Sequence, residues 1–441
     1  MRISVIGCGY LGAVHAAAMA SLGHEVVGID VDERKVEALR AGRAPFFEPG
    51  LPELLLEAGA GGGLTFGTDI AEVAGARVHF VCVGTPQMAG EFRADLSYVD
   101  ASVTSLVPYL RPGDVVVGKS TVPVGTAERL AAQLAPTGAT LVWNPEFLRE
   151  GFAVEDTLHP DRFVYGLPTD AEGVATPAGE AAKALLDEVY ATPLSDGTPL
   201  VVTDYATAQL VKVAANSFLA TKISFINAMA ELCETAGGDV TQLADAIGYD
   251  ARIGRKFLNA GLGFGGGCLP KDIRAFMARA GELGVDQALT FLREIDSING
   301  RRRERMVELA REVCGGSFVG KRIAVLGATF KPNSDDVRDS PALAVADMLE
   351  KAGAHVVVTD PQGIENARAV RPNLEYEADV LEAVRDADVV LLGTEWTQYR
   401  ELDPAQLAGA VRGLHVLDGR NVLDPVRWRE AGWTYRALGR P

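Results

Sequence analysis

The chain opens with two short apolar runs that flank a glycine-rich turn and a stretch of small residues. The first run is RISVIG (2–7), the turn continues as GCGYLG, and the second run is EVVGID (25–30). Strand, turn, helix and strand in this order are typical of a βαβ unit with a parallel sheet. Further apolar runs at 78–84, 115–120 and 140–145 alternate with helical or loop stretches. This rhythm predicts a doubly wound α/β domain.

The hydrophobic pattern then changes to that of a long helix. Residues 205–236 are rich in Ala and Leu and contain neither Pro nor Gly. A helix rises about 1.5 Å per residue, so a helix of this length spans a whole domain and suits a spine between two lobes. The helical pattern continues to about residue 313.

The opening pattern recurs at 321–361, and apolar runs at 387–396 and 414–421 extend it. Its first turn, GATFKPNSDD, lacks the GxGxxG spacing, so we expect a nucleotide-binding half adapted to something other than a dinucleotide. The predicted fold is α/β, with two Rossmann-like doubly wound α/β domains joined by a long central helix and a helical domain. The predicted boundaries are 1–203, 204–313 and 314–441.

Composition narrows the class of partner. The 441 residues are 48% hydrophobic and 23% charged, with a net charge of −17, which argues against nucleic acid or an anionic membrane as a partner. The first residues form a strand and leave no room for a signal peptide, and no apolar run approaches the roughly 20 residues of a membrane span. We therefore expect a cytoplasmic protein. Five cysteines without a CxxC, and scattered histidines, predict neither a disulfide framework nor a metal site.

The first turn has the spacing of a dinucleotide site. Gly7, Gly9 and Gly12 give a tight turn, a close approach to pyrophosphate and close helix packing, while the following helix N-terminus favours phosphate. Asp30 ends the second strand, where an acid binds the adenine ribose and disfavours a 2′-phosphate. The pattern predicts NAD, and a glycine turn without a ligand fits this full context less well.

Polar residues follow three later strands. Thr85, Thr121, Glu146 and Glu150 lie in GTP, KSTVPVG and NPEFLREG, just beyond apolar runs. The carboxyl ends of parallel strands share one rim, so these side chains are predicted to converge on one crevice. Helix caps or turns would explain any one of them, but explain the set less well.

One cysteine stands in a different setting from the others. Cys268 lies in GFGGGCLPKD, followed by Lys271 and Asp272, whereas the other four cysteines are typical of small apolar fillers. A nearby cation favours the thiolate, and flanking glycines leave room for a substrate carbon, so this pattern indicates a nucleophile. A turn with an incidental cysteine is the alternative.

Lys212 and Asn216 are four residues apart in the long helix and therefore share a face. On a helix beside a cofactor cleft, such a pair suggests proton transfer or oxyanion stabilisation. A solvated surface lysine is an equally weighted alternative.

Several segments together resemble the UDP-glucose 6-dehydrogenase family, within the wider UDP-glucose/GDP-mannose dehydrogenases. They are GCGYLG, GTP, KSTVPVG, NPEFLREG, KVAANSFLATKISFINAMAEL, DARIGRKFLNAGLGFGGGCLPKD, GATFKPNSDDVRDSPA and DGRNVLD, in the order of the family. The resemblance implies oxidation of the C6 alcohol of UDP-glucose to UDP-glucuronate with two NAD⁺, through a thiohemiacetal and a thioester on Cys268.

The resemblance also implies individual roles. Cys268 corresponds to the nucleophile, Lys212 and Asn216 to oxyanion stabilisers, Asp272 to an acid–base partner, and Thr121 and Glu150 to residues near the nicotinamide and water. The implied NAD contacts are Gly7, Gly9, Tyr10, Leu11, Gly12, Asp30, Lys35, Thr85, Thr121, Glu150, Lys271 and Arg338. The implied UDP-sugar contacts are Glu146, Phe147, Leu148, Arg149, Glu150, Lys212, Asn216, Phe257, Leu258, Asn259, Ala260, Gly261, Gly265, Lys331 and Arg420.

Arg252, in DARIG, corresponds to an arginine that reaches the substrate of a partner subunit, so the resemblance implies at least a homodimer with central helices at the interface. The chain departs from the family at Gly267, where a serine is usual. Glycine loosens the loop there without removing a group that the mechanism needs.

Four other readings remain open. UDP-N-acetylhexosamine dehydrogenases usually carry a histidine before the cysteine, and this chain has Gly267 there. GDP-mannose dehydrogenases share the thiol chemistry, but the DARIG and FLNAGLGFGG segments resemble the UDP-glucose branch more closely. A simple NAD-dependent alcohol dehydrogenase would transfer one hydride and would not need Cys268. A non-catalytic nucleotide-binding scaffold is disfavoured because Cys268, Lys212, Asn216 and Asp272 are all present.

Overall fold

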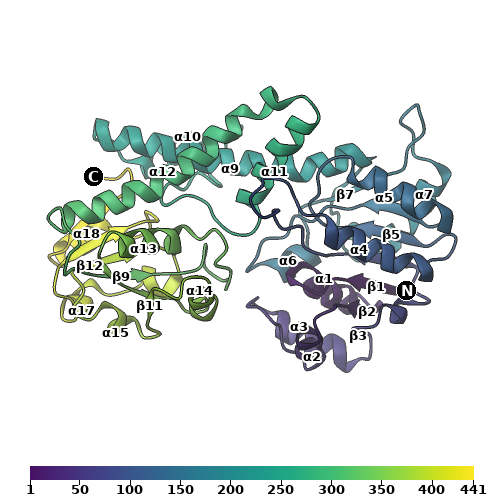
Figure 1. Cartoon of the computed structure of the whole chain (residues 1–441), viewed down its shortest axis with the longest axis horizontal. Helices are drawn as coiled ribbons and strands as arrows, with labels where there is room; N and C mark the ends of the chain where they lie inside the picture. The colour runs from purple at the N-terminus through teal and green to yellow at the C-terminus, as the bar shows by residue number, and fades with distance from the viewer. The chain divides into compact units, whose positions relative to one another are not determined.

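The computed structural model describes residues 1–441, which fold into two compact units. The first unit comprises Met1–Ala215 and Arg274–Gly284, and the second comprises Asn216–Ile273 and Val285–Pro441. Each unit contains one sheet with helices on both of its faces (Figure 1). The division into three domains at residues 203 and 313 stays a prediction.

The first unit contains an eight-stranded sheet in the order β3-β2-β1-β4-β5-β6-β7-β8. All neighbouring strands are parallel except β6 and β7, so the expected parallel rim exists for β1, β4, β5 and β6. The strands are β1 (Arg2–Ile6), β2 (Glu25–Ile29), β3 (Leu64–Gly67), β4 (Val78–Val81), β5 (Val115–Gly118), β6 (Thr140–Trp143), β7 (Phe163–Leu167) and β8 (Leu200–Asp204).

Small residues let the first helix lie against this sheet. Helix α1 buries eight consecutive residues, from Gly12 to Met19, and five of them are alanine or glycine. Its core partners include Ile3 and Val5 of β1, while Ile6 packs on the opposite face. The helices of this unit are α1 (Tyr10–Ser21), α2 (Glu33–Arg40), α3 (Leu51–Ala60), α4 (Ser97–Leu106), α5 (Thr126–Leu134), α6 (Ala153–Leu158), α7 (Pro177–Val189) and α8 (Ala191–Ser195), with 3₁₀ turns at Ile70–Val73, Val107–Tyr109 and Ala135–Thr137.

The second unit contains a six-stranded parallel sheet in the order β11-β10-β9-β12-β13-β14. Its strands are β9 (Arg322–Leu326), β10 (His355–Thr359), β11 (Glu375–Tyr376), β12 (Val389–Leu392), β13 (His415–Asp418) and β14 (Thr434–Ala437). Its helices are α10 (Val240–Gly248), α12 (Thr290–Val313), α13 (Pro341–Lys351), α14 (Ile364–Val370), α15 (Val380–Val384), α16 (Thr397–Arg400), α17 (Pro404–Ala408) and α18 (Pro425–Glu430), with a 3₁₀ turn at Asp286–Leu289.

Two helices contribute residues to both units. Helix α9 (Tyr205–Ala236) has the bounds that the uninterrupted Ala- and Leu-rich pattern predicts, and that prediction is confirmed. Helix α11 (Leu269–Glu282) begins directly after Cys268. The helical stretch ends with α12 at Val313, also as predicted.

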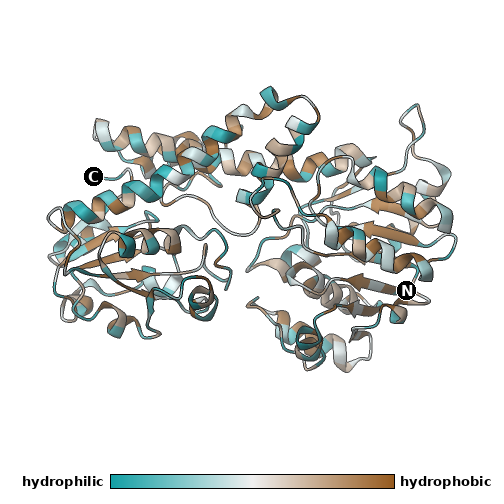
Figure 2. Ribbon diagram, in the orientation of Figure 1, coloured by the Kyte–Doolittle hydropathy of each residue, from teal (hydrophilic) through white to brown (hydrophobic).

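Hydropathy follows this layering. In each unit the central strands are hydrophobic, and the exposed helix faces carry the polar residues (Figure 2). None of the helices combines the length and the apolar sequence that crossing a bilayer requires.

Candidate active site

The glycine turn after β1 has the geometry that a dinucleotide needs. Gly7 has φ +88°, and a Cβ at Gly12 would meet the carbonyl oxygen of Gly7, so both positions require glycine. No atom lies within 4 Å of the position that a Cβ would take at Gly9. Gly9 is also the N-cap of α1 and supplies no side-chain cap, which leaves the N–H groups of the first turn for a phosphate. These residues fit the pyrophosphate of NAD.

Asp30 is held by the turn that it faces. One carboxylate oxygen accepts the N–H of Cys8 at 2.9 Å, and the other accepts the N–H of Asp32 at 2.9 Å. Each oxygen keeps a lone pair for a ribose hydroxyl. The neighbouring Val31 is 95% exposed, which offers an apolar surface that sequence reasoning did not select. Lys35 lies in α2 and is half-buried.

The structure brings two of the predicted rim residues, Thr85 and Thr121, into contact and places a third, Glu146, against Lys119. The hydroxyl of Thr85 donates to the carbonyl of Thr121 at 2.8 Å, which joins the loops after β4 and β5. Glu146, after β6, forms an ion pair with Lys119 at 2.9 Å between Oε2 and Nζ. Lys119 was not among the predicted residues, although it stands in the KSTVPVG segment.

Glu48 is a second residue that sequence reasoning missed. It is 3% exposed and accepts the N–H groups of Gly151 at 2.6 Å and Ala153 at 2.7 Å, and the hydroxyl of Tyr10 also contacts it. The carboxylate thus ties the glycine turn to the segment that follows Glu150. An acid inside the apolar stretch PFFEPGL was the available signal, but its partners lie 38 residues before it and 103 and 105 residues after it in the sequence.

Other members of the 146–150 segment have defined contacts. The guanidinium of Arg149 pairs with Asp156 at 2.6 Å on the surface. The ring of Phe147 contacts two cations: its centroid is 5.3 Å from Nζ of Lys212 and 3.9 Å from the guanidinium carbon of Arg162. Lys212 is half-buried, and its ammonium lies within cation–π range of this ring.

Cys268 differs from the other cysteines in its exposure. It is exposed and directly precedes α11, and its carbonyl accepts the N–H of Asp272 at 2.9 Å in the first helical turn. The positive end of a helix favours an anion such as a thiolate. The other four cysteines are buried, and burial raises their pKa values, that of Cys82 to about 12.

A buried carboxylate lies one turn behind the thiol. Asp272 is 2% exposed, and it accepts hydrogen bonds from Nδ2 of Asn216 at 2.6 Å and from Nζ of Lys271 at 2.5 Å. The structure thus brings together Asn216, Lys271 and Asp272 in the second unit. Lys212 shares the helix face of Asn216, because both belong to α9 and are four residues apart.

The glycines before Cys268 serve close packing. Residues 261–266 are all buried. A Cβ at Gly265 would meet the backbone of Asp339, and Gly263 has φ +88° with the Asn299 side chain beside it. At Gly267 the place of a Cβ is taken by the guanidinium of Arg338, which pairs with Asp336 at 2.7 Å. A serine at position 267 would therefore require the Arg338 guanidinium to move, whereas glycine leaves room for it.

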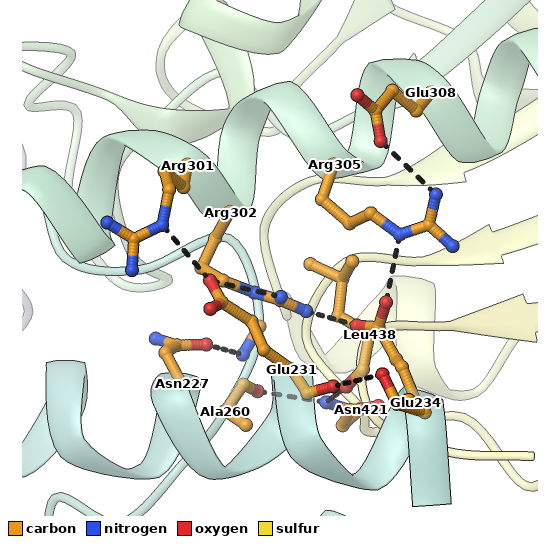
Figure 3. Close-up of polar contacts among 12 residues, drawn as sticks. Asn227, Glu231, Glu234, Ala260, Arg301, Arg302, Arg305, Glu308, Asn421 and Leu438 are labelled. Atoms are coloured by element: carbon orange, nitrogen blue, oxygen red, sulfur yellow. Dashed lines mark hydrogen bonds and ion pairs between the residues drawn. The ribbon is translucent and has the colours of Figure 1, made fainter. Parts of the chain in front are cut away.

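The predicted substrate segment 257–261 is anchored through its backbone. The N–H of Gly261 donates to Asn227 of α9 at 2.9 Å, and the carbonyl of Ala260 accepts Nδ2 of Asn421 at 3.1 Å (Figure 3). Phe257 has φ +67°, which is uncommon outside glycine and stores strain at this segment. Arg255 donates to the carbonyl of Leu258 and the side chain of Asn259, both at 2.8 Å.

An ion-pair cluster holds α9 against α12 beside that segment (Figure 3). Arg302 is 1% exposed and pairs with Glu234 at 2.5 Å, and Glu234 also pairs with Arg305 at 2.9 Å. Glu231 joins the cluster through Arg301 at 3.5 Å. Removing one partner of a buried ion pair leaves an uncompensated charge and is strongly destabilising, so both partners are needed to hold the two helices together.

The cationic side chains predicted to contact the UDP-sugar differ in how far their own protein contacts already occupy them. The guanidinium of Arg420 donates to the backbone carbonyls of Gly393 at 2.7 Å, Gly263 at 3.1 Å and Phe330 at 3.1 Å, so it ties three loops together. Nζ of Lys331 lies 5.2 Å from the ring centroid of Phe330. Arg252 pairs with Asp250 at 2.6 Å on the surface, where its side chain is 90% exposed.

The chain matches three domains of one protein family along its length. Residues 1–192 match the NAD binding domain, 206–301 the central domain and 324–425 the UDP binding domain of the UDP-glucose/GDP-mannose dehydrogenases. The chain belongs to the UDP-glucose/GDP-mannose dehydrogenase family. Its cofactor is therefore NAD, and the glycine turn after β1 lies in the family's NAD-binding domain.

Individual relatives of this family extend the likeness over the full chain. The UDP-glucose 6-dehydrogenase of Rhizobium meliloti (strain 1021) is 42% identical over 446 residues, which cover 100% of each chain. A UDP-glucose dehydrogenase structure from Pyrobaculum islandicum has a TM-score of 0.89 and 39% identity, covering 100% of this chain and 98% of that one. A GDP-mannose dehydrogenase structure from Pseudomonas aeruginosa has a TM-score of 0.52 and 28% identity, covering 99% and 100%.

Proposed function

We propose that the chain oxidises the C6 alcohol of UDP-glucose to the carboxylate of UDP-glucuronate. The observation that carries this proposal is the single exposed cysteine at the start of α11, one turn before the buried Asp272–Asn216 pair. A simple alcohol dehydrogenase needs no such sulfur. A four-electron oxidation needs the half-oxidised carbon to be retained between its two hydride transfers, and a covalent adduct does that.

Two NAD⁺, bound one after the other, would each accept one hydride. The thiolate of Cys268 adds to the C6 aldehyde that the first oxidation leaves, and the adduct is a thiohemiacetal. Loss of the second hydride leaves a thioester, which water hydrolyses to the acid and the free thiol. Lys212 and Asn216 stabilise the negative charge on the C6 oxygen, and Asp272 acts in the proton transfers. Thr121 and Glu150 hold the hydrolytic water, with Glu150 as its base.

The contacts with the two nucleotides are proposed on the same grounds. Residues of the glycine turn and its rim bind NAD: Gly7, Gly9, Tyr10, Leu11, Gly12, Asp30, Lys35, Thr85, Thr121, Glu150, Lys271 and Arg338. The UDP-sugar is bound by the 146–150 segment (Glu146, Phe147, Leu148, Arg149 and Glu150), Lys212, Asn216, the 257–261 segment (Phe257, Leu258, Asn259, Ala260 and Gly261), Gly265, Lys331 and Arg420. Arg420 would contribute to this set by holding the loops of Gly263, Phe330 and Gly393 in place, because its guanidinium donates to their backbone carbonyls.

The three predicted domains would have separate roles. Residues 1–203 would bind NAD, residues 204–313 would provide catalytic residues and the subunit interface, and residues 314–441 would bind the UDP-sugar. The family domain matches at 1–192, 206–301 and 324–425 support this division. We place the reaction in the cytoplasm, where NAD and nucleotide sugars would both be available to it.

A homodimer formed through α9 is part of the proposal. Phe218, Phe225 and Leu232 are 66%, 48% and 60% exposed, and their spacing of seven residues aligns them on one face of the helix. An exposed apolar stripe of this length favours a second copy of the same helix as its cover. The exposed Arg252 would then reach the substrate of the partner subunit.

The decisive experiment counts NADH formed per nucleotide sugar consumed. We expect two NADH per UDP-glucose, little turnover of GDP-mannose, and no acid product from Cys268→Ala, which stops at the aldehyde level. Cys314→Ala is the matched control, because it removes a buried thiol of the same unit and should keep the ratio of two. A ratio of one, or full conversion to the acid by Cys268→Ala, would contradict the proposal.

The dimer is tested by Phe225→Glu, which places a charge in the apolar stripe. We expect light scattering to report monomers for this variant and dimers or larger assemblies for the unaltered chain. Val319→Glu changes an equally apolar, 81% exposed residue outside α9 and should leave the assembly intact. Dissociation by both variants, or by neither, would remove α9 from the interface.

A further inference from the structure

Lys119 is a buried cation that none of the proposed roles uses. It follows β5, is 3% exposed, and its ammonium lies 2.9 Å from Oε2 of Glu146 and 3.0 Å from Oδ1 of Asn144. The hydroxyl of Tyr190 is 3.5 Å away and also donates to Asn144. A buried charge is costly unless it is paired and hydrogen-bonded. We therefore asked what the buried Lys119–Glu146 pair does.

Glu146 is the one charged counterpart of Lys119. The other titratable groups that face it are His15 of α1, Cys82 after β4 and Tyr190 after α7. Burial lowers the pKa of His15 and raises those of Cys82 and Tyr190, so all three are neutral around pH 7. The cluster therefore holds one positive and one negative charge.

Lys119 keeps Glu146 ionised. Burial raises the pKa of Glu146, but the Lys119 charge and the hydrogen bonds from Lys119, Phe147 and Leu148 outweigh burial and bring that pKa below its usual value. The charge and the hydrogen bond of Lys119 are the two largest effects that lower this pKa, so loss of Lys119 would raise it.

The ionised carboxylate shapes the segment that follows it. Oε1 of Glu146 accepts the N–H of Phe147 at 2.7 Å and of Leu148 at 3.0 Å, which fixes the turn after β6. The Phe147 ring in turn lies 5.3 Å from the ammonium of Lys212. A continuous set of contacts thus connects Lys119 to Lys212, entirely within the first unit.

We propose that Lys119 is a positioning residue that, through Glu146, sets the turn of the 146–150 segment and the ring against which the Lys212 ammonium rests. This inference rests on the proposed function, since it assigns that segment to the sugar nucleotide and Lys212 to the C6 oxygen. Lys119 itself touches neither, and it acts through the carboxylate.

Lys119→Met tests this role, because it keeps the length of the side chain and removes the charge. We expect kcat/KM for the sugar nucleotide to fall about 100-fold, with KM raised and kcat lowered, as misplaced groups cost rate steeply. The acid limb of the pH–rate profile should move to higher pH, because Glu146 then takes up a proton more readily. The Kd of NAD should stay the same.

Asp114→Asn is the matched control at the opposite end of β5. Asp114 is 2% exposed, pairs with Arg77 at 3.2 Å, and precedes the strand that Lys119 follows. We expect it to lower stability without moving the pH profile or KM. A folded Lys119→Met with an unaltered pH profile and KM would overturn the proposal.

The double variant Lys119→Met with Glu146→Gln covers the case in which the single variant does not fold. It has no charge left in the cluster around Lys119, so it should fold, stay slow, and lack the displaced acid limb. Unaltered kinetics in the double variant, or failure of both variants to fold, would overturn the proposal by assigning Lys119 to the fold as a whole. All kinetics use whichever of UDP-glucose, GDP-mannose or a UDP-N-acetylhexosamine the unaltered enzyme oxidises. Failure of the proposed function would therefore be seen in the substrate that the unaltered enzyme prefers. Failure of the role proposed for Lys119 would be seen in the kinetics of the variants.

Discussion

The two sheets begin in the same way and use that beginning differently. β1 and β9 each lead into a glycine with positive φ, Gly7 at +88° and Gly327 at +113°. Each following strand, β2 or β10, is followed by an aspartate, Asp30 or Asp360, whose carboxylate accepts an N–H from the turn. The sequence repeat that relates residues 2–30 to 321–361 is therefore a structural repeat as well.

The difference lies in what else the aspartate binds. Asp30 accepts two backbone N–H groups, whereas Asp360 accepts four donors on one oxygen, from Ala328, Thr329 and Trp396, and two on the other. Asp360 is 3% exposed and has no capacity for a ribose. The same carboxylate is a ligand group in one unit and an internal anchor in the other.

The residue two positions after the glycine decides this change of use. It is Gly9 in the first unit, with open space above it, and Thr329 in the second, whose hydroxyl donates to Asp360 at 3.1 Å. Helix α1 begins directly after the first turn, whereas α13 begins only at Pro341. A short glycine turn thus exposes a helix N-terminus to a ligand, and a long loop does not.

The largest expected effect is on stability in the second unit. Asp360→Ala leaves buried donors without an acceptor, so we expect it to lower the free energy of unfolding by about 3–5 kcal/mol. Asp30→Ala should cost less, about 1–2 kcal/mol, because it leaves two donors, the N–H groups of Cys8 and Asp32, without an acceptor, whereas Asp360→Ala leaves six. Urea denaturation followed by tryptophan fluorescence measures both, since Trp143 reports on the first unit and Trp396, Trp428 and Trp433 report on the second. Equal losses would mean that the two carboxylates are equivalent.

Gly9→Ala tests whether the first glycine turn, unlike the second, binds a ligand. A methyl group fits into the space above Gly9, so stability should hold, but it would meet the pyrophosphate and weaken NAD binding about 10- to 100-fold. Calorimetric titration with NAD measures the change. Thr329→Gly is the converse and should lower stability without creating an NAD site, because the loop before α13 stays long. Unchanged NAD affinity in Gly9→Ala would contradict the assignment of the turn.

Asp30→Asn should weaken NAD binding about 10-fold, because a charge-assisted hydrogen bond to the ribose becomes a neutral one. The preference for NAD over NADP should narrow as well, since the charge that repels a 2′-phosphate is gone. The ratio of the two dissociation constants is the readout. A ratio that does not change would exclude Asp30 from the ribose site.

The smallest effect is on the pH dependence of stability, and its sign differs between the units. Burial raises the pKa of Asp418, at the end of β13, although hydrogen bonds from Leu423, Arg420 and Tyr435 lower it in part. The folded state therefore binds the proton more tightly than the unfolded chain, whose aspartates titrate near about 3.9. The resulting stability is lost as pH rises from about 4 through the raised pKa.

Glu146 has the opposite sign, because its folded pKa lies below the usual value of about 4.3. Its contribution is present at neutral pH and is lost as pH falls through the folded pKa. Relative to the unaltered chain, Asp418→Asn should gain stability as pH rises above about 4, and the deficit of Glu146→Gln should shrink as pH falls below about 4. Denaturant unfolding at several pH values would show both slopes, and slopes of equal sign would contradict this account.

Much of the fold follows from local patterns. The bounds of α9, the strands β1, β2, β4, β5 and β6, and the repeat that begins at residue 321 were all predicted, because periodicity and glycine spacing are properties of adjacent residues. The direction of β7 was not predicted. It lies antiparallel beside β6, and nothing within the sequence FVYGL states which neighbour a strand pairs with or in which direction.

The site divides in the same way: neighbouring residues in the sequence predict some of its parts, and only contacts between distant segments decide the others. The sequence alone determined the candidate nucleophile, since Cys268 differs from the other cysteines in its immediate neighbours, and it determined the NAD turn by the spacing of three glycines. Only the tertiary structure decided that Lys119 faces Glu146, that Glu48 holds Gly151, and that Asp360 is saturated. Burial and pairing depend on segments 25 to 100 residues apart, and the charge state of a side chain depends on what those segments place around it.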